Sequence, residues 1–450
     1  MLSHQEADED IFAENNLKLF LYSMVFSSMW LMITTQSPLT GFLGYLDFTD
    51  FTYGFMMSLP YFAALFQILG SHFLNGMSEK KVLYVFPAMV RGVMWILIGI
   101  IPILPGRYSM PVIMGCAVVA AVSGAFVNVT LTTMLGLIIS GKIIGKYLAK
   151  RNRIGVMANL GCGLMVSLLL DHMIAPYNYM IIFGAAGICS LADASIIWKV
   201  KEGCVSKGKD IKENCHKEPT IRQMFSNSRF RGYVIFWVAW NFSYYIASPF
   251  NAKYCLGPLK MTFTQFTIGC DYLYYAVTIT ALPLWGTFID RYGCKNTIKV
   301  AFTIISLLGF LWLGAKPYHI LTPVLFYGFG GTVWCLVELL SQHMMISQTP
   351  ASNRASYIAV YSALAMVIGQ GLSILTGGAV MEMIDALIGN GHLTFGRIAL
   401  DKYQLLFLFA CLLRGMVLVL LLPLLKEEKD IPLIQVARDI LTYGRKRYNG

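Results

Sequence analysis

The 450 residues are 56% hydrophobic and only 13% charged, and the mean hydropathy is +0.61. A soluble protein carries about a quarter charged residues, so this composition excludes an ordinary soluble domain. The formal net charge of +11 does not indicate a nucleic-acid partner, because the Lys and Arg residues lie between apolar runs. The composition therefore predicts an all-α, polytopic membrane protein.

The apolar runs are long enough to cross a bilayer, which takes about 20 helical residues for about 30 Å of hydrocarbon. Residues 1–16, before the first run, are acidic and lack the basic start of a signal peptide. We therefore expect a cytoplasmic N-terminal segment and a retained first span. Twelve spans are predicted, at residues 17–37, 52–74, 82–104, 109–140, 154–175, 178–199, 232–252, 262–289, 297–315, 319–346, 356–382 and 403–425.

The longest polar stretch, residues 200–231, separates the sixth span from the seventh. It divides the chain into an N-terminal six-helix bundle over 17–199 and a C-terminal one over 232–425. Most of the 35 Lys and Arg residues lie in the loops that fall on the same side of the membrane as the N-terminus. The positive-inside rule therefore predicts that both termini and the central loop are cytoplasmic. Residues 426–450 are expected to form a basic amphipathic tail on the inner surface of the plasma membrane.

A turn motif follows the eighth span, where the chain reads Gly286-Thr-Phe-Ile-Asp290-Arg291-Tyr-Gly293-Cys-Lys. Gly286 would allow close approach of helices, and Gly293 would permit the backbone geometry of a tight turn. Asp290 is suited to cap or pair with a helix end, while Arg291 lies on the positive inner side. The motif is what a short cytoplasmic turn between two spans requires.

A weaker copy of this motif follows the second span, in Ser-His-Phe-Leu-Asn75-Gly. The amide of Asn75 stands where the first copy has an aspartate. A second repeat is the pair Asn-Arg, which occurs at Asn152-Arg153 and again at Asn353-Arg354. The first pair is expected to open the fifth span and the second pair the eleventh. The repeat is weak in letters but consistent in spacing, as expected for two parallel six-helix halves.

The strong motif, its degenerate copy and the twelve spans around a long central loop resemble the major facilitator superfamily of transporters. The resemblance covers nearly the whole chain and implies two pseudo-symmetric six-helix halves that rock around a central cavity. It also implies a cytoplasmic gate in which Asp290 holds the start of the fifth span near Arg153, and Asn75 holds the start of the eleventh near Arg354. Gly286, Arg291 and Gly293 would belong to the same gate.

In that family the first, fourth, seventh and tenth helices line the cavity, and each of these spans carries a polar or aromatic face at helical spacing. Aromatic rings stack on the C–H surfaces of a ring-shaped solute, and amides pair with its hydroxyl groups. We therefore expect a small polar solute, a sugar or related metabolite rather than a lipophilic drug. Packing between helices is the alternative for each single aromatic residue. The candidate substrate-binding residues are Trp30, Asn128, Thr132, Trp237, Trp240, Asn241, Tyr244, Tyr245, Tyr327 and Trp334.

Ionisable residues inside the spans are a further signal, because burying a charge in lipid is costly. Glu338 lies on the cavity face of the tenth span and is the predicted proton-coupling carboxylate. Arg91 and Arg414 are expected to pair or snorkel rather than bind solute. Asp193 is expected to pair with loop lysines, and Asp271 to be hydrated near the outer rim.

Two alternatives stay open. The first is a multidrug or metabolite exporter of the same fold, although the fifth span lacks the proline-containing motif of many drug–proton antiporters. The second is a membrane enzyme or sensor, which is disfavoured because the seven histidines are dispersed. We expect a monomer that is not an enzyme and needs no cofactor or metal. Its expected partners are a small-molecule substrate and membrane lipids. Coupling to a proton or sodium co-substrate and uniport both stay open.

Overall fold

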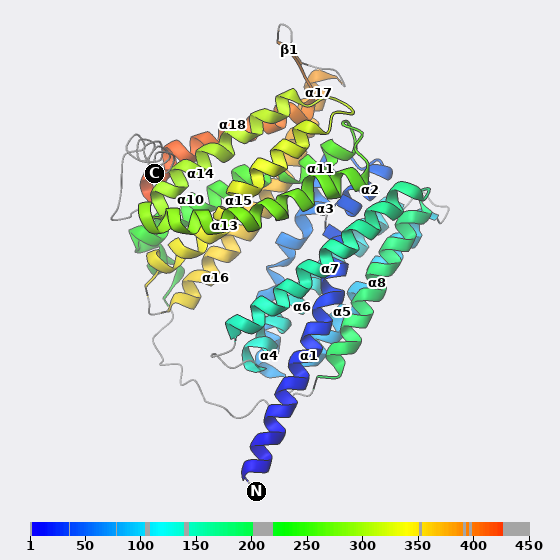
Figure 1. Ribbon diagram of the computed structural model, residues 1–450, viewed down its shortest axis with the longest axis vertical. Helices are drawn as coiled ribbons and strands as arrows, with labels where there is room; N and C mark the ends of the chain where they lie inside the picture. Colours follow the sequence, from blue (N-terminus) through cyan, green and yellow to red (C-terminus); the bar gives the residue numbers. More distant parts are fainter. Residues whose placement is uncertain are drawn as a thin grey trace, which may run out of the picture. The chain divides into compact units, whose positions relative to one another are not determined.

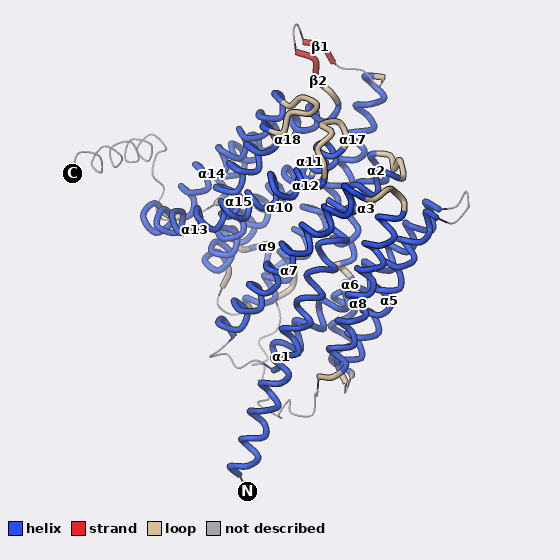
Figure 2. The backbone as a smooth tube through the Cα atoms, turned by 45° about the vertical axis from the view of Figure 1, so that its right-hand side comes forward, coloured by secondary structure: helices blue, strands red, loops and turns tan. Residues whose placement is uncertain are grey.

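The computed structural model describes residues 2–35, 37–77, 79–103, 109–138, 144–200, 219–350, 353–389, 393–395 and 398–425. Helices make up nearly all of this part of the chain (Figures 1 and 2). The predicted tail at 426–450 and residues 201–218 of the predicted central loop lie outside the described residues.

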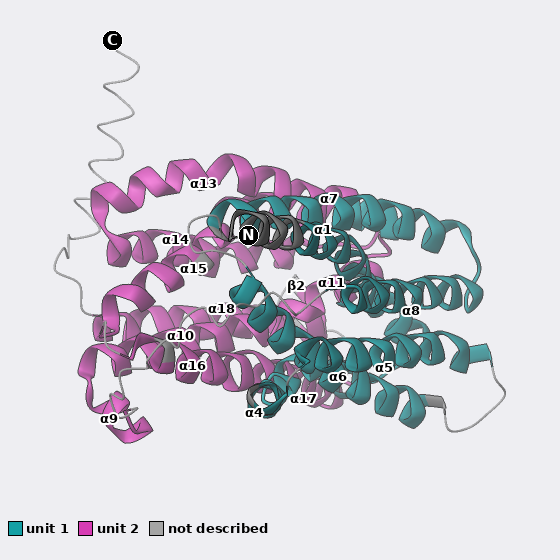
Figure 3. Cartoon of the chain, turned by 90° about the horizontal axis from the view of Figure 1, so that it is seen from below, with its two compact units in different colours: residues 1–214, 262–267 teal, residues 215–261, 268–450 magenta. Residues whose placement is uncertain are grey.

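The chain forms two compact units, coloured separately in Figure 3. Unit 1 comprises Met1–Asn214 together with Thr262–Thr267, and unit 2 comprises Cys215–Met261 and Ile268–Gly450. A short piece of the predicted eighth span therefore belongs with the N-terminal helices. The sequence pattern places that whole span in the C-terminal bundle.

Unit 1 is built from long helices that bury a shared apolar core. Figure 1 shows α1, α5, α7 and α8 running side by side, and α6 packs on α5. Phe20 of α1, Tyr84 of α5 and Ile197 of α8 are each 0% exposed in this core. The elements of unit 1 are α1 (Leu2–Thr35), α2 (Ser37–Tyr45), α3 (Asp50–Ala63), α4 (Phe66–Gly76), α5 (Lys80–Ile100), η1 (Ile101–Ile103), α6 (Ser109–Ile138), α7 (Ile144–His172), α8 (Tyr177–Trp198) and α12 (Phe263–Phe266).

Unit 2 packs α13 against α15, and α10 against α18 and the π-helical turn η4. A second π-helical turn, η2 (Thr267–Tyr272), joins α12 to α13 within the eighth span. The elements of unit 2 are α9 (Ile221–Ser226), α10 (Ser228–Tyr245), α11 (Ser248–Leu256), α13 (Leu273–Tyr292), α14 (Cys294–Leu308), η3 (Gly309–Gly314), α15 (Leu321–Gln348), α16 (Arg354–Leu364), η4 (Ala365–Leu372), α17 (Ser373–Ile388), β1 (Leu393–Phe395), β2 (Ile398–Leu400), α18 (Lys402–Leu421) and η5 (Leu422–Leu424).

Eleven helical segments in the described residues are long and apolar enough to cross a membrane. The predicted seventh span is instead divided between α10 and α11, with Pro249 in the first turn of α11. Proline fits a first helical turn but interrupts a continuous helix, which accounts for the break. Outside the spans, β1 and β2 pair antiparallel with Leu393 opposite Leu400, a small exception to the all-α prediction.

Two helices begin well before the predicted spans. The first starts at Leu2 rather than residue 17, and α7 starts at Ile144 rather than residue 154. Hydropathy detects only the apolar part of a helix, and α7 opens with charged residues such as Lys146 and Lys150. The described N-terminal segment is therefore helical, continuous with the first span.

The start of α12 is held within unit 1 by a carboxylate from α7. Asp171 accepts 2.8 Å hydrogen bonds from the backbone N–H groups of Phe263 and Thr264. One turn earlier in α7, the hydroxyls of Ser167 and Thr267 are 2.6 Å apart. The two Asp171 contacts cap α12, because the first N–H groups of a helix have no partner within it. Sequence reasoning missed this clamp, since nothing in the pattern of α7 marks Asp171 as a partner for a segment about 90 residues away.

Candidate solute-binding site

The predicted faces of the seventh and tenth spans meet inside unit 2. The rings of Tyr244 on α10 and Trp334 on α15 have centroids 4.1 Å apart at an interplanar angle of 39°. The ring of Tyr245 lies 4.9 Å from that of Tyr244 in a T-shaped contact. All three side chains are half-buried, so the cluster combines packed aromatic surface with groups that solvent or a solute can reach.

A network of hydroxyl groups extends from the same two helices. The Tyr233 hydroxyl lies 3.1 Å from the Ser341 hydroxyl, which lies 3.0 Å from the hydroxyl of Tyr361 on α16. Asn241 donates a 2.8 Å hydrogen bond to the Trp237 carbonyl and is also hydrogen-bonded to Tyr361. The polar side of α10 is therefore tied to α15 and α16, which fixes the orientation of Asn241.

Trp237 and Trp240 occupy a different environment. Both are 0% exposed, and Trp240 stacks on Phe302 of α14 with ring centroids 3.8 Å apart. Trp237 makes a T-shaped contact with the same ring at 5.7 Å. In this structure both indoles belong to the core of unit 2, in agreement with the packing alternative. Helical spacing correctly places them on the same face of α10 as Tyr244. However, α14 covers the part of that face that carries the two tryptophans.

Tyr327 and Asp271 are linked to the aromatic cluster through electrostatic interactions. Tyr327 on α15 interacts electrostatically with Tyr244 and with Asp271 of η2. Asp271 is half-buried, so its expected hydration near the outer rim stays a prediction. Its neighbours Cys255, Cys270 and Tyr327 come from α11, η2 and α15.

In unit 1, Trp30 lies beside a buried ion pair. The guanidinium of Arg91 sits 3.9 Å from the centroid of the Trp30 ring, within the range of a cation–π interaction. Its Nη2 lies 3.4 Å from Asp193 Oδ2, and its Nε donates a 2.9 Å hydrogen bond to the Ser190 hydroxyl. The prediction that Arg91 pairs is confirmed. The prediction that Asp193 pairs with loop lysines is wrong, because its partner lies inside the bundle.

The same carboxylate gathers two more helices. Asp193 accepts hydrogen bonds from the Ser23 hydroxyl on α1 at 2.5 Å and the Tyr84 hydroxyl on α5 at 2.8 Å. Asp193 is 0% exposed and Arg91 is 3% exposed. The pair therefore joins α1, α5 and α8 in the interior of unit 1. Trp30 thus serves this packing in the structure.

Asn128 and Thr132 lie one turn apart on an exposed face of α6. The Thr132 hydroxyl donates a 2.9 Å hydrogen bond to the Asn128 carbonyl, so the helix backbone already uses it. The α6 residues Thr130 and Met134 are buried in the core instead. The two candidates are therefore accessible, and their assignment to solute binding stays a prediction.

Arg414, the other buried cation, is held by backbone groups. Its Nε donates a 3.2 Å hydrogen bond to the Ala410 carbonyl, and its Nη1 donates one of 3.3 Å to the Ile305 carbonyl. It also interacts electrostatically with Tyr244. Arg414 therefore ties α18 to α14, as a structural role predicts.

The motif after the eighth span forms a one-residue turn. α13 ends at Tyr292 and α14 begins at Cys294, with Gly293 between them at φ 81° and ψ 169°. This region of backbone conformation is open essentially to glycine alone, so the tight turn predicted at Gly293 is confirmed. Its part in the gate stays a prediction. Among the described residues, no atom lies within 4 Å of a Cβ built on Gly286. Close helix approach at Gly286 is therefore not seen.

The partners predicted for the gate differ between the two halves. Arg354 is the first residue of α16, so Asn353-Arg354 opens the eleventh span as predicted. Asn152 and Arg153 instead lie in the third turn of α7, which begins at Ile144. Backbone N–H groups there are already bonded within the helix and offer nothing for a carboxylate to cap. The prediction that a helix begins at Arg153 is therefore wrong, and Asp290 has no helix start to cap at that residue.

Other gate and coupling residues are described in part. Asp290 and Arg291 are exposed at the end of α13. The Arg291 guanidinium lies 5.3 Å from the centroid of the Tyr292 ring. The side chains of Asn75 and Glu338 lie outside the described residues, so both assignments stay predictions.

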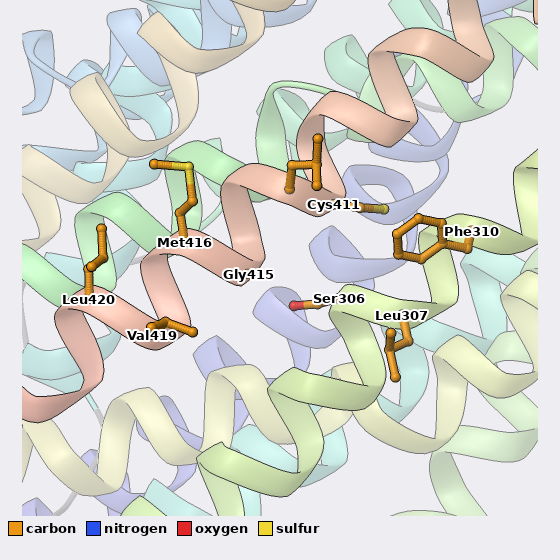
Figure 4. Close-up of a pocket in the computed structure, with 9 residues that line it drawn as sticks. Ser306, Leu307, Phe310, Cys411, Gly415, Met416, Val419 and Leu420 are labelled. Atoms are coloured by element: carbon orange, nitrogen blue, oxygen red, sulfur yellow. The ribbon is translucent and has the colours of Figure 1, made fainter. Parts of the chain in front are cut away.

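An apolar groove of about 480 Å³ lies between α14 and α18 in unit 2 (Figure 4). Leu307, Phe310, Met416 and Val419 are among its lining residues. The Ser306 hydroxyl in its wall already donates a 2.8 Å hydrogen bond to the Phe302 carbonyl. Its lining offers no further polar group that could orient a sugar or nucleoside. The groove is therefore a different kind of surface from the Tyr244–Trp334 cluster.

No group of three or more His, Cys, Asp or Glu residues that could hold a metal ion occurs in the described part of the chain.

Two units of membrane-length helices, with a polar aromatic cluster in one and a buried ion pair in the other, define a polytopic α-helical membrane protein. The model of the Major Facilitator Superfamily matches residues 19–374, most of the chain, and the protein therefore belongs to this superfamily. This confirms the resemblance that the Gly286–Lys295 motif carries. No curated protein sequence matches the chain.

Solved transporter structures share the fold at low sequence identity. The nucleoside transporter NupG superposes with a TM-score of 0.69 at 13% identity, covering 93% of this chain and 100% of NupG. A D-xylose–proton symporter gives 0.63 at 12%, covering 90% and 97%. A bacterial homologue of the human lysosomal transporter Spinster gives 0.62 at 12%, covering 93% and 94%. These similarities establish the twelve-helix fold of the superfamily.

Proposed function

We propose that this protein is a secondary active transporter that moves a small polar solute across the plasma membrane by alternating access. The observation that carries the proposal is the Tyr244–Trp334 pair, with ring centroids 4.1 Å apart and both side chains half-buried. The Ser341–Tyr361 hydroxyl contact, about two helical turns along α15 from Trp334, supplies polar groups in the same unit. Rings beside hydroxyls suit a solute that has both a flat or C–H face and hydroxyl groups.

The preferred solute is a sugar or related metabolite. The solved structures of similar fold include a nucleoside transporter and a D-xylose–proton symporter, and both solute types present a ring with hydroxyl groups. A multidrug or metabolite exporter of the same fold is the alternative, and it would favour apolar, cationic compounds. The Tyr244–Trp334 cluster, together with the Ser341–Tyr361 hydroxyls in the same unit, supports the polar solute.

Further parts of the proposal concern orientation and coupling. The distribution of Lys and Arg supports cytoplasmic termini, and the protein is proposed to work as a monomer. A proton, or alternatively sodium, is the proposed co-substrate, with Glu338 as the coupling carboxylate predicted from its position on α15. Gly286, Asp290, Arg291, Gly293, Asn75, Arg153 and Arg354 are retained as the proposed cytoplasmic gate.

Uptake into proteoliposomes tests the proposal. The purified protein is reconstituted and offered labelled D-xylose, uridine and a lipophilic cation, each with and without an imposed pH gradient. The proposal predicts uptake of a polar solute and accumulation when the gradient is present. Uptake of the cation alone would favour the exporter, and uptake of no compound above protein-free vesicles would contradict the proposed solute class.

A further inference from the structure

Asp271 is a carboxylate within a span for which the proposed site has no role. It lies in η2, a π-helical turn of the eighth span, and its side chain is half-buried. Among the described residues, no hydrogen bond or ion pair reaches this carboxylate. π-Helical turns occur frequently at functional sites, because they reorient a side chain within an otherwise regular helix.

Three other carboxylates in the described part of the chain have partners. Asp193 is bonded to Ser23, Tyr84 and Arg91. Asp171 accepts two backbone N–H groups, and Asp385 lies 3.1 Å from the Lys402 ammonium. An ionised carboxylate without such partners is expensive in an apolar environment. Asp271 therefore stands apart from the structural carboxylates.

The groups around Asp271 indicate what would neutralise it. Cys255 of α11, Cys270 of η2 itself and Tyr327 of α15 interact with it electrostatically. None of these three carries a positive charge in its ordinary state. A hard metal cation would need several oxygen ligands, which two thiols and a phenol do not provide. A proton needs only the carboxylate.

The position of Asp271 also links it to the proposed solute site. Tyr327 interacts with both Asp271 and Tyr244, and Tyr244 packs on Trp334. Gly269, on the same π-helical turn, lies against Val324 of α15, where a Cβ would come within 3.2 Å of that side chain. A shift of the η2 backbone would therefore press directly on α15, the helix that carries Tyr327 and Trp334.

We propose that Asp271 is a proton-binding residue that couples solute movement to the proton gradient. The proposal rests on the proposed transport function and names a coupling group additional to Glu338. Protonation makes the side chain neutral, like its uncharged neighbours. Release of the proton restores the charge, which favours a conformation in which water reaches η2. Tyr327 connects the two protonation states to the occupancy of the Tyr244–Trp334 cluster.

A carbodiimide that partitions into membranes tests proton binding without any solute. Dicyclohexylcarbodiimide reacts with protonated carboxyl groups in apolar surroundings, and mass spectrometry locates the adduct. We expect modification of Asp271 that rises severalfold from alkaline to acidic pH and disappears in Asp271→Asn. Asp385, paired with Lys402 at 3.1 Å, is the matched control and should stay unmodified. Absence of an adduct at Asp271, or an adduct independent of pH, would overturn the proposal.

Transport assays then separate coupling from transport itself. Asp271→Asn should retain counterflow of D-xylose or uridine, whichever the wild type carries, and lose accumulation driven by the pH gradient. Asp385→Asn removes the same charge at the rim and should retain both activities. Accumulation that survives in Asp271→Asn would overturn the coupling role while leaving the proposed function intact. Absence of counterflow in the wild type would overturn the proposed function. The carbodiimide result would then still decide whether Asp271 binds a proton.

Discussion

The carboxylate of Asp171, near the end of α7, accepts a 2.8 Å hydrogen bond from the backbone N–H of Phe263, the first residue of α12. Asp171→Ala leaves this N–H group and that of Thr264 without an acceptor. We expect the free energy of unfolding to fall by about 0.5–2 kcal/mol, the usual cost of losing a helix cap. Hydrogen–deuterium exchange should accelerate at residues 263–267.

Asp171→Asn is the matched control for this clamp, because its amide oxygen can still accept one of the two hydrogen bonds. Its exchange should lie between that of the wild type and that of Asp171→Ala. Equal protection of residues 263–267 in all three proteins would show that the carboxylate does not hold α12.

Removing one partner of the buried Arg91–Asp193 pair should lower the free energy of unfolding more than replacing both partners with apolar residues. Asp193→Leu leaves the guanidinium buried without its partner, so we expect a loss of about 3–5 kcal/mol. The double variant Asp193→Leu/Arg91→Met removes both charges and should recover much of that loss. Thermal unfolding in detergent measures both. A double variant as unstable as the sum of its single variants would contradict this account of the pair.

Tyr244 and Trp334 should act together on solute affinity. Tyr244→Ala and Trp334→Ala are each expected to weaken binding, and a double-mutant cycle should give a coupling energy of about 0.5–1.5 kcal/mol. Trp240→Ala is the comparison, because this indole is 0% exposed. It should mainly lower stability, by about 3–5 kcal/mol. Isothermal titration and thermal unfolding separate the effects, and unchanged affinity in both cluster variants would remove them from the site.

The two glycines of the signature motif should respond differently to alanine. Gly293→Ala forces a side chain into the φ 81°, ψ 169° conformation, at a cost of about 1–3 kcal/mol. At Gly286 the added methyl group meets no described atom within 4 Å, and alanine favours a helix interior by about 0.5–1 kcal/mol. Thermal unfolding should therefore show opposite signs. A destabilising Gly286→Ala would instead reveal a close approach at this glycine in another conformation of the protein.

Much of the fold could be predicted from the sequence, because apolar length and cation placement report directly on spans. The turn at Gly293 followed from the need for a glycine conformation between two helices. The starts of α1 and α7 could not be placed this way, since their first turns are polar. The break after Tyr245 required reading Pro249 as the first turn of a new helix.

The candidate site was only partly predictable. Helical spacing correctly gathered Tyr244 and Trp334 on facing helices, but it could not show that Phe302 covers Trp240. The Arg91–Asp193 pair joins residues about 100 positions apart, and such contacts depend on which helices become neighbours. Charge and depth alone therefore marked these residues as notable without naming their partners.

Counterflow is the sharpest measurement of carrier-mediated transport of a polar solute by this protein. Vesicles containing the protein are loaded with unlabelled D-xylose or uridine and diluted into a trace of the same labelled solute, with no ion gradient. We expect transient accumulation of label that is reduced in Tyr244→Ala/Trp334→Ala and absent from protein-free vesicles. Label that never exceeds equilibrium with either solute would contradict the proposed transport.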